Sequence, residues 1–118
     1  MYKDWPKIAA DLTTAVKELR TGTPDTMKAF TAMAIAATQA KALDTKTKEL
    51  IALAIAVATH CDPCISFHAE SAHKHGATRE EVMETVGMAI YMGAGPAVMY
   101  GAQAVEAFDQ YVAKNATA

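Results

Sequence analysis

The sequence has few aromatic residues, two cysteines and no block of positive charge. One Trp, four Tyr and three Phe make up 7% of the 118 residues, so few large side chains are available for a core. The eleven Lys and Arg residues are scattered among thirteen Asp and Glu residues, which gives a net charge of −2. Without a basic patch, the composition excludes no fold but gives no electrostatic basis for nucleic-acid binding.

No targeting or membrane segment is expected. The N-terminal stretch MYKDWPKIAADL lacks the order of basic and then apolar residues that is typical of a secretion signal. The longest apolar run, residues 50–59, is too short to cross a bilayer. We therefore predict a soluble, cytoplasmic protein with no membrane partner.

Helix is the consistent prediction for the whole chain. No segment alternates with period two, no Asn-Gly or Asp-Gly hairpin signal occurs, and helix-forming Ala, Met, Leu, Lys and Glu dominate. We expect an all-α single domain over residues 1–118, with about six helices. The expected helices cover residues 5–19, 24–40, 45–59, 61–75, 79–92 and 96–114, and the tail 115–118 should fray.

Helix ends are marked by local signals. Asp4, Thr23 and Asp44 stand at expected N-caps, and Thr78 with Glu81 matches a capping box. Gly76 should supply a left-handed stop after residue 75, and the sequence Gly-Ala-Gly-Pro at residues 93–96 should break the chain.

The expected helix over residues 45–59 is apolar nearly all round, as in the middle of a bundle or in a subunit interface. A chain of this length with few aromatics would have a thin core as a monomer. We therefore expect a homo-oligomer.

The sequence Cys61-Asp62-Pro63-Cys64, followed by His68, carries the chemistry. At about 100° per residue, Cys61, Cys64 and His68 fall on one stripe of a helix that begins near Cys61. The free N–H groups and the positive dipole at a helix start favour a thiolate, and His68 can accept a proton from Cys64. This pattern predicts a thiol–disulfide redox centre.

Other interpretations of the two cysteines remain open. A structural disulfide would close too short a loop to stabilise the chain much and is disfavoured in the cytoplasm. Zinc would need a fourth ligand from His60, His73, His75 or Glu49, none of which forms a recognisable second pair. Haem attachment fails because Ile65, and not His, follows Cys64. Taken alone, Glu49 is more typical of a solvated residue near a helix start.

The combination of Glu49, Cys61, Cys64 and His68, with a Gly-stopped helix and a T-x-E-E helix start after it, resembles a known group. It is similar to the AhpD-like alkylhydroperoxidases of the carboxymuconolactone decarboxylase superfamily, over residues 30–100. The resemblance implies the family's all-α fold, assembled as trimers or hexamers. It also implies peroxidase or disulfide reductase activity without metal or haem.

By the same resemblance, Cys64 would attack the peroxide, Cys61 would resolve the product, His68 would act as base and Glu49 as proton relay. An external dithiol, of lipoyl type in the characterised system, would be the reductant. Pro63 stands where those relatives carry a further relay His. A non-peroxidatic disulfide reductase or redox sensor, in which Cys61 attacks, and a non-catalytic helical interaction module are the alternatives.

Overall fold

The computed structural model describes residues 1–116, and this part of the chain forms five α-helices and no strand. The predicted all-α class is therefore confirmed. Of the tail predicted to fray, residues 117–118 lie outside the described part, and the last helix continues through Ala116. The helices are α1 (Trp5–Gly22), α2 (Pro24–Thr38), α3 (Thr45–Ala58), α4 (Asp62–Lys74) and α5 (Arg79–Ala116).

The predicted caps account for most of the helix boundaries. Asp4 and Asp44 each accept a hydrogen bond from the backbone N–H three residues later, at 3.2 and 2.7 Å. Thr78 and Glu81 bond each other's backbone N–H groups in a complete capping box. Gly76 ends α4 with φ +86°, a left-handed conformation that suits glycine. Thr23 precedes α2, but its side chain makes no capping hydrogen bond.

Helix α5 contains two helical segments that meet at a kink, where two helices over residues 79–92 and 96–114 are predicted. At Ala94 the backbone has φ 54° and ψ −135°, and Pro96 follows, so the expected break is present as a sharp bend. Its two halves pack closely, since a Cβ added at Gly101 would lie 2.6 Å from Cγ1 of Val86. By length and composition α5 could span a membrane, but the kink divides it and it packs against α3 and α4.

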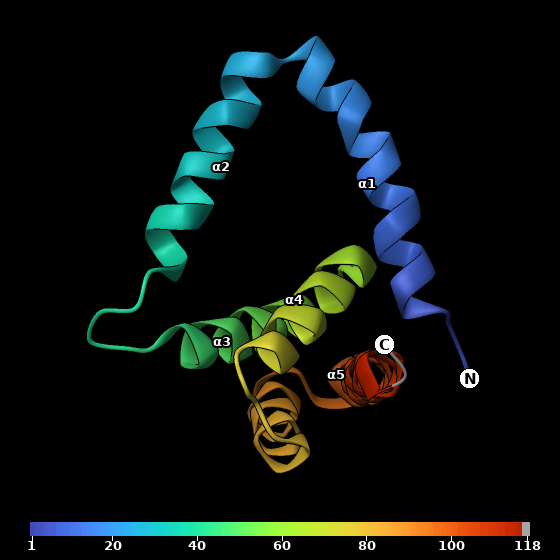
Figure 1. Ribbon diagram of the computed structural model, residues 1–118. Coiled ribbons are helices and arrows are strands. Elements are labelled where there is room, and N and C mark those ends of the chain that lie inside the picture. Colours follow the sequence, from blue (N-terminus) through green and yellow to red (C-terminus); the bar gives the residue numbers. More distant parts are fainter. Residues whose placement is uncertain (117–118) are drawn as a thin grey trace.

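Helices α3, α4 and α5 form the body of the molecule, and the start of α1 completes its core (Figure 1). Buried side chains meet there from all four helices; among the large ones are Trp5, Leu53, Val57, Ile65, Val82, Phe108 and Tyr111. The Ser66 hydroxyl joins three of these helices, donating to the Trp5 carbonyl at 2.6 Å and bonding the Tyr111 hydroxyl at 2.8 Å. Burial raises the pKa of Tyr111, so this hydroxyl stays neutral. The helix that carries the cysteines is thus fixed in the centre.

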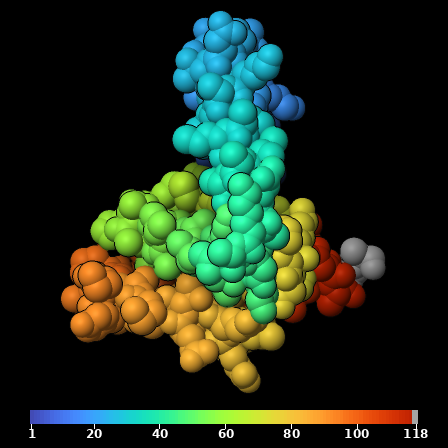
Figure 2. Space-filling model, turned by 90° about the vertical axis from the view of Figure 1, so that its left-hand side faces the viewer, coloured from blue at the N-terminus to red at the C-terminus, as the bar shows by residue number. Residues whose placement is uncertain are grey.

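The rest of α1 and all of α2 form an arm that rises from this body (Figures 1 and 2). On α1 the buried residues are Trp5 and Ala9, both near its start, and α2 has none. Large apolar side chains on α2 are instead more than half exposed, namely Phe30, Met33 and Ile35. The arm therefore presents an apolar surface that the body of the same chain does not cover.

Candidate functional site

The site begins at the tight junction between α3 and α4. The Cys61 N–H donates to the Ala56 carbonyl at 3.1 Å and the His60 N–H to the Val57 carbonyl at 3.3 Å, which is the bond pattern of a Schellman motif. His60 occupies its left-handed position, with φ 56°, where glycine is usual. Residue 61 ends this motif and is also the N-cap of α4, so α3 and α4 fix its backbone from both sides.

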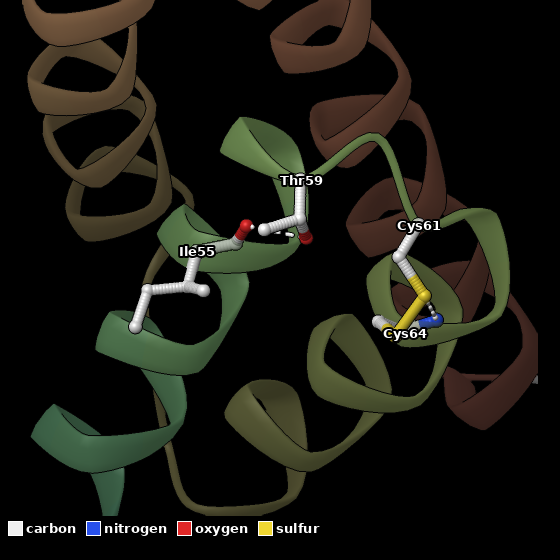
Figure 3. Close-up of a disulfide and its surroundings, with 4 residues drawn as sticks. All are labelled: Ile55, Thr59, Cys61 and Cys64. Atoms are coloured by element: carbon white, nitrogen blue, oxygen red, sulfur yellow. Dashed lines mark hydrogen bonds between the residues drawn. A yellow bond between two sulfur atoms is a disulfide. The ribbon is translucent and has the colours of Figure 1, made fainter.

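Cys61 and Cys64 form a disulfide with their Cα atoms 5.2 Å apart, and both residues are half-buried (Figure 3). The Cys64 N–H donates to the Cys61 sulfur at 3.3 Å, so this sulfur takes the place of a capping oxygen. Pro63 lies in the first turn of α4, where its missing N–H leaves no unpaired acceptor. The predicted position of the pair at a helix start is therefore observed, with access from solvent.

Glu49 and His68 lie together beside this pair of cysteines. His68 follows Cys64 by one turn of α4, and its Nδ1 lies 2.8 Å from Oε2 of Glu49 on α3. The Glu49 side chain is 6% exposed and that of His68 34% exposed. A carboxylate this deeply buried requires a partner, and His68 supplies it while its ring still reaches solvent. The hydrogen bond at Nδ1 leaves Nε2 as the ring nitrogen available for proton transfer.

Lys3 and Asp62 form a second polar contact at the same motif. The Lys3 Nζ lies 2.5 Å from Oδ2 of Asp62 and 2.7 Å from Oε1 of Gln103 on α5. No motif in the sequence singles out Lys3 or Gln103. Residues 3 and 62 are separated by 59 positions, and no local pattern signals their pairing.

The remaining histidines are held by ordinary contacts. His73 packs edge-on against Phe108 and His75 bonds the Ser71 carbonyl. Among residues 1–116, no group of three His, Cys, Asp or Glu side chains is placed to hold a metal ion. A shallow cavity of about 320 Å³ lies next to the junction; it is lined by Ala58, His60, Met92, Gly93, Pro96 and Ala97.

Residues 24–107 match the model of the carboxymuconolactone decarboxylase family. The chain belongs to this family. The predicted resemblance is thereby confirmed, and the matched range contains the cysteines, Glu49 and His68 but not Lys3. Solved members of the family have a similar fold, as the following comparisons show.

A carboxymuconolactone decarboxylase family protein from Legionella pneumophila has a similar structure, with 50% identity and a TM-score of 0.88 over 91% of this chain and 96% of that one. A Thermotoga maritima family member, for which a role in an antioxidative response has been suggested, has 26% identity and a TM-score of 0.82 over 94% of both chains. An uncharacterized Haemophilus influenzae protein is 42% identical over 108 residues, which is 92% of this chain and 96% of that protein. An uncharacterized Cupriavidus necator protein is 45% identical over 86 residues, 73% and 76% of the two chains.

Proposed function

We propose that the protein is a thiol-dependent peroxidase or disulfide oxidoreductase of AhpD-like type. The observation that carries this proposal is the combination of a solvent-accessible Cys61–Cys64 pair at a helix start with a His68–Glu49 hydrogen bond of 2.8 Å one turn away. A pair that only stabilised the fold would gain little from a loop of three residues. Membership of the family and the suggested antioxidative role of the Thermotoga relative support the same reaction class.

In the proposed cycle, His68 accepts the Cys64 proton and Glu49 stabilises the charged ring. The Cys64 thiolate attacks the outer peroxide oxygen, the O–O bond breaks, and the alcohol or water leaves with a proton from His68. Cys64 is then a sulfenic acid. The Cys61 thiol attacks its sulfur, the S–O bond breaks, and the disulfide forms as the hydroxyl group leaves with the thiol proton as water. An external dithiol, of lipoyl type by resemblance, attacks the disulfide and is itself oxidised, which restores both thiols.

The test uses the fully reduced protein, mixed with cumene hydroperoxide and separately with a small aromatic disulfide. The loss of two thiols per chain with peroxide, together with one alcohol formed, is the expected result. Cys64→Ser should abolish peroxide consumption, and Cys61→Ser should leave a sulfenic acid that dimedone traps on Cys64. One zinc ion per chain with both thiols blocked would refute the proposal in favour of a zinc site.

A disulfide reductase without peroxidase activity is the second candidate. It is favoured by the position of Cys61 at the N-cap of α4, where the helix dipole stabilises a thiolate. In this case Cys61 forms the mixed disulfide with substrate, and Cys64→Ser traps it. The two candidates differ in the variant that accumulates an adduct. The peroxidase predicts a sulfenic acid in Cys61→Ser, and the reductase predicts a mixed disulfide in Cys64→Ser.

We also propose that the working form is a homo-oligomer, a trimer or a hexamer, in which the arm packs on another copy. Exposed apolar side chains support this: they lie on α2 and also on α5, at Met88, Tyr91, Met92 and Met99. Surface of this kind is unusual on a monomer. Sedimentation analysis of the wild type and of Phe30→Lys/Met33→Lys tests it, since the variant should dissociate. A monomeric wild type at micromolar concentration would refute it.

A further inference from the structure

The segment before α1 is tied down by side chains of α5. The Glu106 carboxylate accepts hydrogen bonds from the backbone N–H groups of Tyr2 and Lys3 and from the Trp5 indole, the last at 2.9 Å. Gln110 accepts from the Trp5 N–H at 2.8 Å and donates to the Lys3 carbonyl at 2.7 Å. Both backbone polar groups of Lys3 are therefore bonded, although this residue lies outside any helix. We call these contacts the N-terminal clasp.

The clasp places the Lys3 ammonium group next to the C-x-x-C motif. Asp62, which follows Cys61 directly, is its ion-pair partner, and Gln103 accepts a second hydrogen bond. The side chains of Lys3 and Asp62 are 28% and 30% exposed, so water screens this pair less than it would a fully exposed one. The hydrogen bond to Asp62 raises the pKa of Lys3, which keeps the residue cationic over the range in which thiols titrate.

Tyr100 extends the same cluster to the other side of Cys61. Its ring stacks on His60 with centroids 4.5 Å apart and planes 10° from parallel. The Lys3 Nζ lies 5.9 Å from the centroid of the same Tyr100 ring, within cation–π range. Lys3 thus contacts Asp62 directly and His60 through Tyr100, and these are the two neighbours of Cys61.

The Lys3–Asp62 ion pair changes the net charge near the dithiol. Asp62 contributes a negative charge from the first turn of α4 and Glu49 contributes one from α3. His60 precedes Cys61 directly, and His68 follows Cys64 by one turn. From α5, Glu106 is held by the clasp. When a thiolate forms at residues 61 or 64, the adjacent Asp62 carboxylate opposes it unless the Lys3 cation balances that charge.

We propose that Lys3 acts on the dithiol through Asp62: its ammonium group balances the charge of the carboxylate that directly follows Cys61. The proposal rests on the thiol chemistry proposed above but not on peroxide as the substrate. It predicts that loss of the Lys3 charge raises the pKa of the more acidic thiol. The conformation of the junction should stay intact, because the backbone of Lys3 remains bonded to Glu106 and Gln110.

The test measures alkylation of the reduced protein by iodoacetamide between pH 6 and 9. Lys3→Met should slow alkylation at pH 7 by about three- to tenfold. This corresponds to moving the pH profile of the alkylation rate upward by as much as about one pH unit. Lys3→Arg should retain the wild-type profile. Lys3→Met/Asp62→Asn should recover most of the rate, because the unbalanced carboxylate is gone. The matched control is Lys7→Met, which removes an ion pair with Asp11 on an exposed face of α1 and should change nothing.

Circular dichroism and thermal unfolding show whether each variant is folded. A Lys3→Met profile that superimposes on the wild type overturns the proposal. So does a double variant as slow as Lys3→Met, since Lys3 would then act through structure alone. Alkylation needs no peroxide, so a protein that consumes no peroxide but shows the predicted shifts refutes the proposed peroxidase and leaves the role of Lys3 intact.

Discussion

Replacing His68 by Ala should destabilise the fold because it leaves the buried Glu49 carboxylate without its partner. Leaving a buried, charged acceptor without its hydrogen-bond donor costs about 3 kcal/mol or more. Here the His68 side chain is 34% exposed, so water reaches the carboxylate in the variant, and the expected cost falls to about 2–3 kcal/mol. The free energy of unfolding, measured by urea denaturation of the oxidised protein, reports this value.

The double variant Glu49→Gln/His68→Ala separates stability from chemistry. With the Glu49 charge removed, a buried amide remains. The loss in free energy of unfolding relative to wild type should then fall to about 1 kcal/mol. The rate of thiol oxidation should stay at least about 100-fold below wild type in both variants, because the base is absent from each. His75→Ala, at the C-cap of the same helix and bonded to a backbone carbonyl, is the matched control and should leave that rate unchanged.

Two results would refute this reasoning. If His68→Ala and the double variant lose the same free energy, the Glu49–His68 pair is not an electrostatic unit. If His68→Ala oxidises as fast as His75→Ala does, the ring takes no part in proton transfer. Both measurements use one set of purified proteins, and the stability data show that any lost activity does not come from unfolding.

Three further predictions concern the scaffold. Gly101→Ala places a Cβ 2.6 Å from Val86 and should cost about 1–3 kcal/mol in urea denaturation; an unchanged midpoint would show that the two halves of α5 move apart freely. Ala94→Gly should stabilise by about 0.5–1 kcal/mol, because φ 54° suits glycine, and a lower thermal midpoint would contradict this. Burial acts to raise the pKa of Glu106, but hydrogen bonds from Trp5, Tyr2 and Lys3 outweigh it and lower the pKa below 4.5. The stability that Glu106 contributes should therefore be present above pH 4.5 and be lost as the pH falls through the lowered value, and Glu106→Gln should remove this part of the pH dependence of unfolding.

The parts of the structure that follow from sequence are those set by short-range chemistry. The caps at Asp4 and Asp44, the capping box at Thr78 and the stop at Gly76 each depend on residues a few positions apart. The kink near Ala94 is predicted for the same reason, from the Gly and Pro residues around it. The start of α4 at the cysteines followed from Pro63 and the spacing of the motif.

The long-range contacts could not be predicted in this way. From periodicity alone, Glu49 looked like a solvated residue, and only the family resemblance assigned it to His68. The pairing of Lys3 with Asp62 depends on how α1 and α5 pack, since nothing local to residue 3 distinguishes it from other surface lysines. The arm shows the same limit, because the helical pattern of α2 predicts a helix but not whether the chain itself covers it.

The N-terminal clasp can form only late in synthesis, because it needs side chains of α5. Trp5 belongs to the same buried cluster as Phe108 and Tyr111, and the backbone of residues 2–3 is bonded to Glu106, more than 100 positions later. The C-x-x-C motif therefore leaves the ribosome well before the helix that supports it. Until α5 emerges, the nascent chain carries both thiols without the charge balance and packing of the finished site, so chain completion itself limits when the dithiol acquires its final reactivity.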